Sequence, residues 1–160
     1  MVHILGDGSN AGTRRLAWFT PAQATEMLPL VRQIVADLVA LDRVIRSQQE
    51  QLRGIEKIEP IGDQADYADE LADMRESLES DRQRFERCLE ELGALGVEPH
   101  RPIDGSVDFP AMLHRRPVRL CWSPGDSVVG HWHEVGQSSQ QRRPLDPGSF
   151  PAASRKLPPR

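Results

Sequence analysis

Two histidines separated by a single residue are the feature of this sequence that most suggests chemistry. His131 and His133 lie in a stretch that alternates as a β-strand does, so both imidazoles are expected on one face. Two imidazoles with a carboxylate begin a divalent-metal site, and Asp126, Asp108 or Glu134 could supply the carboxylate. Glu134 is the weakest, because alternation sends it to the opposite face. We therefore predict His131, His133 and Asp126 as candidate metal ligands, the alternative being hydrogen bonding within a polar patch.

A wider group of polar residues in the last third of the chain could bind a small molecule. Its members are Asp108, Asp126, His133, Glu134 and Arg142. A carboxylate beside a histidine fixes the tautomer and raises the basicity of the ring, as a general base requires. An arginine offers two parallel donors to a carboxylate or phosphate ligand. The alternative is a network of ion pairs that holds the C-terminal segment onto the sheet.

Aromatic residues and a cysteine accompany this polar group. Trp122 and Trp132 could form a wall for a ligand together with Trp18, although packing against the helices is the favoured interpretation. Cys121 precedes Trp122, and strand alternation turns the two side chains to opposite faces. A nucleophilic cysteine needs a helix N-terminus or a neighbouring cation to lower its pKa, and Arg119 or His133 could supply the cation. The favoured interpretation is that Cys121 is a buried, inert residue, because free cysteines are often simply small buried side chains.

Composition restricts the classes of protein to which these residues can belong. The 160 residues fit one domain of about 100–200 residues, and no apolar run approaches the roughly 18 residues that span a bilayer. Residues 1–6 hold too short an apolar patch for a signal peptide, so we expect a reduced, cytoplasmic protein. Residues 21–98 carry nine basic and eighteen acidic side chains, which argues against nucleic acid as a partner. The motifs of nucleotide-binding loops and serine hydrolases are missing.

Two long helices are predicted ahead of the segment that carries this chemistry. The first helix has a clear start signal. Thr20 can cap it, Pro21 suits its first turn, and Gln23 completes a capping box with Thr20. Seam residues spaced alternately four and three apart follow and predict two helices. The seams are Met27, Val31, Ile34, Leu38, Leu41, Ile45, Gln48 and Leu52, then Tyr67, Leu71, Met74, Leu78, Asp81, Phe85, Cys88, Leu92 and Leu95.

The two helices are expected to fold back on each other as an antiparallel hairpin within residues 20–96. Pro29 should kink the first helix or shift its start, and Gly96 should end the second. With a short connection, Asp81 is expected opposite Leu38. A carboxylate without a partner there costs several kcal/mol, so Asp81 needs a partner, a water molecule or a position turned towards solvent, and we favour exposure to solvent.

A small antiparallel sheet is predicted after the hairpin. Residues 118–122 and 128–133 alternate as strands do, and turn residues at 123–126 join them. Residues 16–19 are expected to add a third strand. The predicted fold class is therefore α+β, a long antiparallel helical hairpin with a small antiparallel β-sheet. The expected organisation is a flexible N-terminal segment at 1–15, a single domain at 16–145 with its sheet region at 105–136, and a disordered proline-rich tail at 146–160.

A series of short motifs runs through the predicted domain in order. The motifs are Phe19-Thr20, Leu28-Pro29, Leu92-Gly93, Gly96-Val97, Val107-Asp108-Phe109-Pro110, Leu120-Cys121-Trp122, Gly125-Asp126, Trp132-His133-Glu134 and Arg142. Over roughly residues 18–145 they resemble an uncharacterised prokaryotic family, the domain of unknown function 2203. The resemblance implies a small α+β protein with no established activity. Asp126 stands where that family usually has glutamate, and His131 is not part of its signature.

The leading functional expectation is a small cytosolic structural or interaction module that homodimerises through its helical hairpin. Apolar positions beyond the seams support a homodimer, because one small sheet cannot cover them all. These positions are Leu28, Leu30, Val35, Val39 and Val44. The lack of a complete catalytic signature favours a protein that is not an enzyme. The alternative is a small-molecule or divalent-metal-binding protein, with hydrolase-like chemistry, that uses the polar group on the sheet. No membrane partner is expected, and no cofactor other than a divalent metal.

Overall fold

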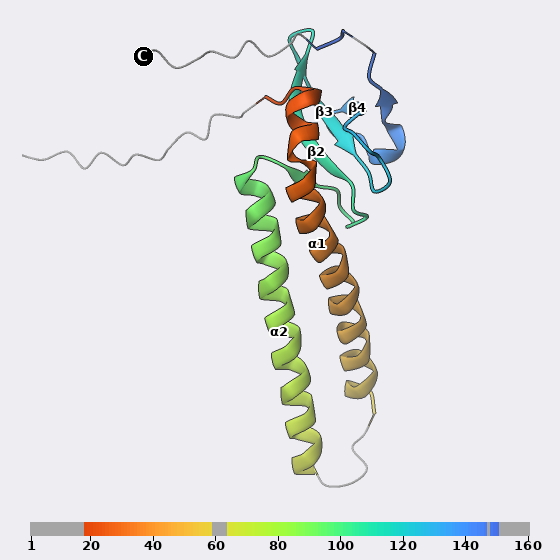
Figure 1. Cartoon of the computed structure of the whole chain (residues 1–160). Helices are drawn as coiled ribbons and strands as arrows, with labels where there is room; N and C mark the ends of the chain where they lie inside the picture. The colour runs from red at the N-terminus through yellow and green to blue at the C-terminus, as the bar shows by residue number, and fades with distance from the viewer. Residues whose placement is uncertain (1–17, 59–63, 147, 151–160) are drawn as a thin grey trace, which may run out of the picture.

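The computed structural model describes residues 18–58, 64–146 and 148–150 (Figure 1). Within them, two packed helices and one antiparallel sheet make an α+β fold with a helical hairpin, which confirms the predicted fold class. The expected flexible segment at 1–15 lies outside the described residues, as does most of the expected tail at 146–160. None of the described helices combines the length and the apolar character needed to cross a bilayer.

The first helix, α1 (Pro21–Glu56), begins at the predicted residues because its first turn satisfies its own backbone donors. Thr20 Oγ1 accepts a hydrogen bond from the Gln23 amide at 3.2 Å, and Gln23 Oε1 accepts one from the Thr20 amide at 3.0 Å. Pro29 lies inside the helix and does not shift its start. A proline there removes one backbone hydrogen bond, a loss that the burial of Leu28 and Val31 outweighs.

The second helix, α2 (Gln64–Ala94), runs antiparallel to α1 and ends as predicted at a glycine (Figure 1). Gly96 has a φ of 78°, a conformation that glycine adopts without steric cost. This conformation lets the Val97 amide donate to the Leu92 carbonyl at 3.0 Å. The chain therefore leaves the hairpin and enters the sheet at a defined angle.

The pairing of the two helices differs from the prediction at a polar layer. Gln48 Nε2 donates to Asp81 Oδ2 at 3.0 Å and to Ser77 Oγ at 3.2 Å. Asp81 thus faces Gln48 rather than Leu38, and its side chain is only 16% exposed, so both parts of the prediction were wrong. The two polar seam residues pair because a carboxylate keeps its hydrogen bonds opposite an amide and loses them opposite a leucine.

Among the described residues, five short strands form one antiparallel sheet in which every strand lies beside its neighbour in the sequence. They are β1 (Glu98–Pro99), β2 (Val107–Leu113), β3 (Arg116–Trp122), β4 (His131–Glu134) and β5 (Arg143–Pro144).

Two details of the predicted sheet were wrong. Residues 16 and 17 lie outside the described residues, and Trp18 and Phe19 do not continue a strand. The Phe19 amide instead makes one hydrogen bond to the Pro110 carbonyl, at 2.8 Å. The strand expected at 128–133 begins only at its fourth residue, because the Val129 amide donates to a threonine hydroxyl of α1 at 3.1 Å and is not free for a ladder.

The sheet has an apolar face and a polar face, and the apolar face packs on the first half of α1. Its buried side chains are Val107, Phe109, Ala111, Leu113, Val118, Leu120 and Trp122, which meet Ala24, Leu28, Val31, Val35 and Leu38 of the helix. Because strand residues alternate between faces, Asp108 and Cys121 turn to the other side. The far half of the hairpin projects beyond the sheet (Figure 1).

Candidate metal centre

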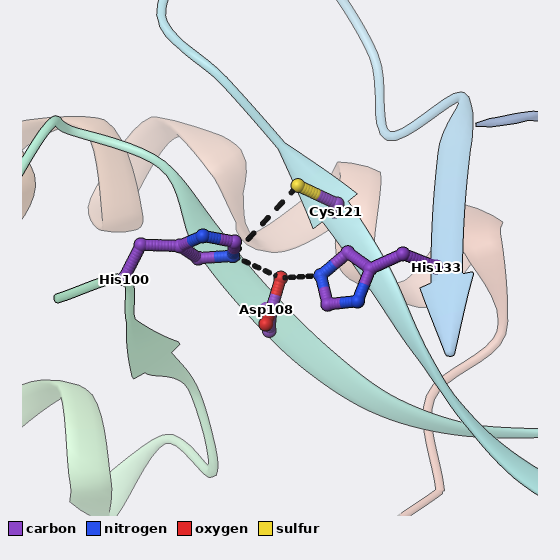
Figure 2. A group of neighbouring side chains, drawn as sticks. All are labelled: His100, Asp108, Cys121 and His133. Carbon is purple, nitrogen blue, oxygen red and sulfur yellow. Dashed lines mark hydrogen bonds and ion pairs between the residues drawn. The ribbon is translucent and has the colours of Figure 1, made fainter. Parts of the chain in front are cut away.

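Four side chains meet on the polar face of the sheet, and each comes from a different part of it (Figure 2). His100 directly follows β1, whereas Asp108, Cys121 and His133 belong to β2, β3 and β4. Asp108 lies opposite Cys121 in the ladder between β2 and β3. The alternation that buries the neighbouring apolar residues thus also delivers the polar ones to one spot. We call these four residues the tetrad.

The potential ligand atoms of the tetrad converge on one point. Asp108 Oδ1 lies 2.6 Å from His100 Nε2 and 2.8 Å from His133 Nε2. Cys121 Sγ lies 3.9 Å from the same His100 nitrogen. One ligand atom from every residue falls within 4.8 Å of the others. Figure 2 shows both rings directed towards the carboxylate between them, and the thiol joined to His100 by a dashed line.

The ring of His133 is fixed by the backbone of its own strand. Its Nδ1 lies 2.7 Å from the carbonyl oxygen of Glu134. A carbonyl oxygen can only accept, so Nδ1 carries the proton and the lone pair of a neutral ring is on Nε2. That lone pair points at Asp108, which is itself an acceptor. A histidine whose second nitrogen is held by a carbonyl is the arrangement found in metal sites.

The tetrad does not have the arrangement of a cysteine, histidine and aspartate triad. In such a triad the histidine contacts the nucleophile with one ring nitrogen and the orienting carboxylate with the other. Here Cys121 and Asp108 both approach Nε2 of His100. Two polar groups directed at the same ring nitrogen cannot relay a proton along a chain. They are arranged instead to surround a positive charge.

Burial and charge distinguish the members of the tetrad. Cys121 and His133 are completely buried, whereas the side chains of His100 and Asp108 are 11% and 13% exposed. The hydrogen bond to Asp108 raises the pKa of His100 to about 10, with a further contribution from Cys121, although burial opposes the rise. Without a metal, the His100 imidazolium therefore supplies the positive charge of this cluster.

A second ion pair lies on the same face. Arg142 Nη1 donates to Asp126 Oδ2 at 2.5 Å, and its Nη2 lies 3.4 Å from Oδ1. The Ser123 amide donates to the same carboxylate at 3.0 Å. The hydrogen bond from Arg142 holds the pKa of Asp126 below its usual value, although burial opposes this. Asp126 is thus fully engaged and is not part of the tetrad.

The predicted metal ligands are only partly brought together. His133 joins the tetrad, and so does Asp108 of the wider polar group. His131 shares their face and lies opposite Cys121 in the ladder, but its Nδ1 is buried with no hydrogen-bond partner among the described residues. Glu134 points elsewhere and forms an ion pair with Arg116 at 2.6 Å, although its carbonyl holds His133.

The two tryptophans of the candidate site lie on the apolar side of the sheet. Trp122 belongs to the core, and its Nε1 donates to the Asp126 carbonyl at 2.9 Å. Trp132 packs against the core, with the guanidinium of Arg143 5.1 Å from the centre of its ring. Neither residue lines the tetrad, so the packing interpretation agrees with their positions.

Two members of the tetrad were not found as ligands from the sequence. His100 follows a strand of only two residues, which is too short to show alternation. Cys121 was placed on the correct face but interpreted as inert, because one cysteine carries no ligand spacing. The available signal was that Asp108 and Cys121 both occupy positions of the alternation opposite to the apolar ones, in consecutive strands.

Comparison with known proteins identifies a family but no characterised relative. A search of curated proteins and a search of solved structures each gave no match. The sequence model of the family described as "Uncharacterized conserved protein (DUF2203)" matches residues 17–145, a span that includes the tetrad. The chain therefore belongs to this family of uncharacterised conserved proteins.

Proposed function

We propose that this protein binds a divalent transition-metal ion, zinc or an ion of similar preference, through His100, Asp108, Cys121 and His133. The observation that carries the proposal is the convergence of four ligand atoms, one from each residue, within 4.8 Å. Four is the number of ligands in a structural zinc site.

The chemistry of the donor atoms selects the class of metal. Two imidazole nitrogens and a thiolate suit zinc, cobalt or iron, whereas magnesium and calcium prefer oxygen ligands throughout. A thiolate and a carboxylate together carry two negative charges, which a divalent cation neutralises. This balance matters because Cys121 and His133 are fully buried, where an uncompensated charge is costly.

The number and burial of the ligands favour a structural role for the metal. Catalytic zinc sites keep one position for water or substrate, whereas structural sites use four protein ligands. Here the ligands come from β2, β3, β4 and the residue that follows β1. An ion bound to all of them would tie four neighbouring strands together, so metal binding would contribute directly to the free energy of folding. A reducing, cytoplasmic setting would keep the Cys121 thiol available.

Metal content tests this proposal. The purified full chain is stripped with a chelator, dialysed against zinc, and analysed for bound zinc by mass spectrometry. We expect one zinc ion per chain in the wild type and a loss of most of it in Cys121→Ser and His100→Ala. The matched control is His131→Ala, on the same face but outside the tetrad, which should retain the zinc. Equal zinc content in all four proteins, with the fold checked by circular dichroism, would contradict the proposal.

Homodimerisation through the hairpin remains a second proposal with weaker support. The sheet and its turns cover Leu28 and Val35 and partly cover Val39 within one chain. Leu30 and Val44 stay 49% and 44% exposed, and their spacing of two heptads places them on one stripe of α1. Sedimentation equilibrium over a broad concentration range distinguishes a dimer from a monomer. A monomeric mass at every concentration would end this proposal and leave the metal proposal unaffected.

A further inference from the structure

We infer that Arg142 is a positioning residue of the metal centre, which holds a positive charge beside the Cys121 thiolate and thereby tunes the bond between sulfur and metal. The inference rests on the proposed metal site and adds a residue from outside the tetrad. It identifies the function of the C-terminal segment, which the metal proposal leaves unassigned.

The course of the chain places Arg142 on the face of the tetrad. Arg142 lies directly before β5, where Pro144 pairs with His131 of β4. His131 in turn pairs with Cys121 of β3, so these three residues form one row across the sheet. A residue two positions from Pro144 in extended chain shares its face. Arg142 has that extended conformation, with φ −65° and ψ 147°.

Several contacts hold the C-terminal segment in this place. The Leu145 amide, directly after β5, donates to the carbonyl of Gly130, directly before β4, at 2.9 Å. Ser139 Oγ donates to Asp104 Oδ2 at 3.3 Å, in the turn between β1 and β2. The segment that carries Arg142 is therefore attached to the sheet on both sides of this residue.

Asp126 then fixes the direction of the guanidinium. Both of its carboxylate oxygens contact Arg142, and its own position is set by the Ser123 amide. The guanidinium has five N–H donors, of which Asp126 occupies two. The Ser123 amide that holds this carboxylate lies two residues after Cys121, just past the end of β3. The charge of Arg142 is therefore held at the end of the strand that carries the sulfur.

A cation beside a metal-bound thiolate has a measurable consequence. It withdraws electron density from sulfur, so the charge-transfer band from thiolate to a cobalt probe moves to higher energy. Groups that orient or polarise a ligand in this way change metal affinity by about 10–100-fold when removed. A residue that merely stabilised the fold would leave the energy of this band unchanged.

The experiment uses the metal-free full chain titrated with Co²⁺ under reducing conditions. Arg142→Met should move the near-ultraviolet charge-transfer band to longer wavelength. Arg142→Lys, which keeps the charge, should restore part of this shift. The matched control is Arg119→Met. Arg119 lies on the same face of the sheet, but it pairs with Glu98 at 3.6 Å rather than with Asp126. It should leave the band in place.

The outcomes separate this inference from the proposal on which it rests. No thiolate band in the wild type would overturn the metal proposal, and the role of Arg142 with it. A wild-type band that Arg142→Met leaves unmoved would overturn the role of Arg142 alone. If Arg142→Met does not fold, Arg142→Gln decides, because it keeps a donor for Asp126 while removing the charge. A shift in the same direction supports the inference, and an unmoved band overturns it.

Discussion

Replacing His133 by alanine should separate a metal centre from a polar cluster that only stabilises the fold. The side chain is 1% exposed, and its removal deletes contacts to the Glu134 carbonyl and the Asp108 carboxylate. The contact with Asp108 joins two acceptors when the ring is neutral and adds no hydrogen bond. Loss of the hydrogen bond from Nδ1 leaves a buried carbonyl without its donor, which predicts a loss of about 1–3 kcal/mol in the metal-free protein. Zinc at about 100 times its dissociation constant adds about 2.7 kcal/mol to the wild type. The variant should gain almost none of this.

The assay is urea denaturation followed by circular dichroism, with chelator and with zinc. Wild type, His133→Ala and the control His131→Ala are compared under both conditions, so that the zinc-dependent part of the unfolding free energy is measured for each protein. We expect this part to vanish in His133→Ala and to persist in His131→Ala. An equal gain in wild type and His133→Ala would refute the reasoning, whatever the stability of the metal-free proteins.

Three further predictions concern the core, the C-terminal segment and the ion pair. Leu38→Ala should lower the free energy of unfolding by about 2–5 kcal/mol, because the side chain is 1% exposed. Val44 is 44% exposed, so Val44→Ala should lower it by less than about 0.5 kcal/mol. Similar losses for the two variants in chemical denaturation would mean that the core is misassigned. Phe150→Ala should lower the thermal midpoint by a few degrees because Phe150 packs against the core, and an unchanged midpoint would show that this contact contributes nothing. Arg142 holds the pKa of Asp126 below its usual value, so the pair stabilises the fold above the unfolded pKa of about 3.9 and this contribution is lost as the pH falls through the folded pKa. Asp126→Asn should therefore be less stable than wild type at neutral pH but equally stable in strong acid, and a difference that stays constant across this range would contradict the assignment.

Features of the fold that depend on a few neighbouring residues could be predicted from the sequence. The capping box of Thr20 and Gln23 fixes the start of α1 through contacts within one turn. Gly96 ends α2 for a similarly local reason, the conformation of one residue. Strand alternation also predicted that Cys121 and His133 would leave the apolar face.

Features that depend on distant pairing could not be predicted in the same way. Asp81 meets Gln48 because the two helices pair in a register that brings these polar residues together, and no local pattern encodes that register. The strands β1 and β5 have two residues each, so they show no period. His100 becomes a tetrad member only because β1 pairs with β2. The site therefore arises from the order of the strands, which the residue types alone do not reveal.

The cobalt spectrum of the tetrad tests the central claim most directly. Metal-free full chain is titrated with Co²⁺ beside Cys121→Ser, and absorption is recorded from the near ultraviolet through the visible. The proposed centre predicts saturation at one equivalent, the strong visible bands of four-coordinate cobalt, and a thiolate charge-transfer band that is absent in Cys121→Ser. Weak bands of six-coordinate cobalt, or the same spectrum in both proteins, would contradict a metal centre formed by His100, Asp108, Cys121 and His133.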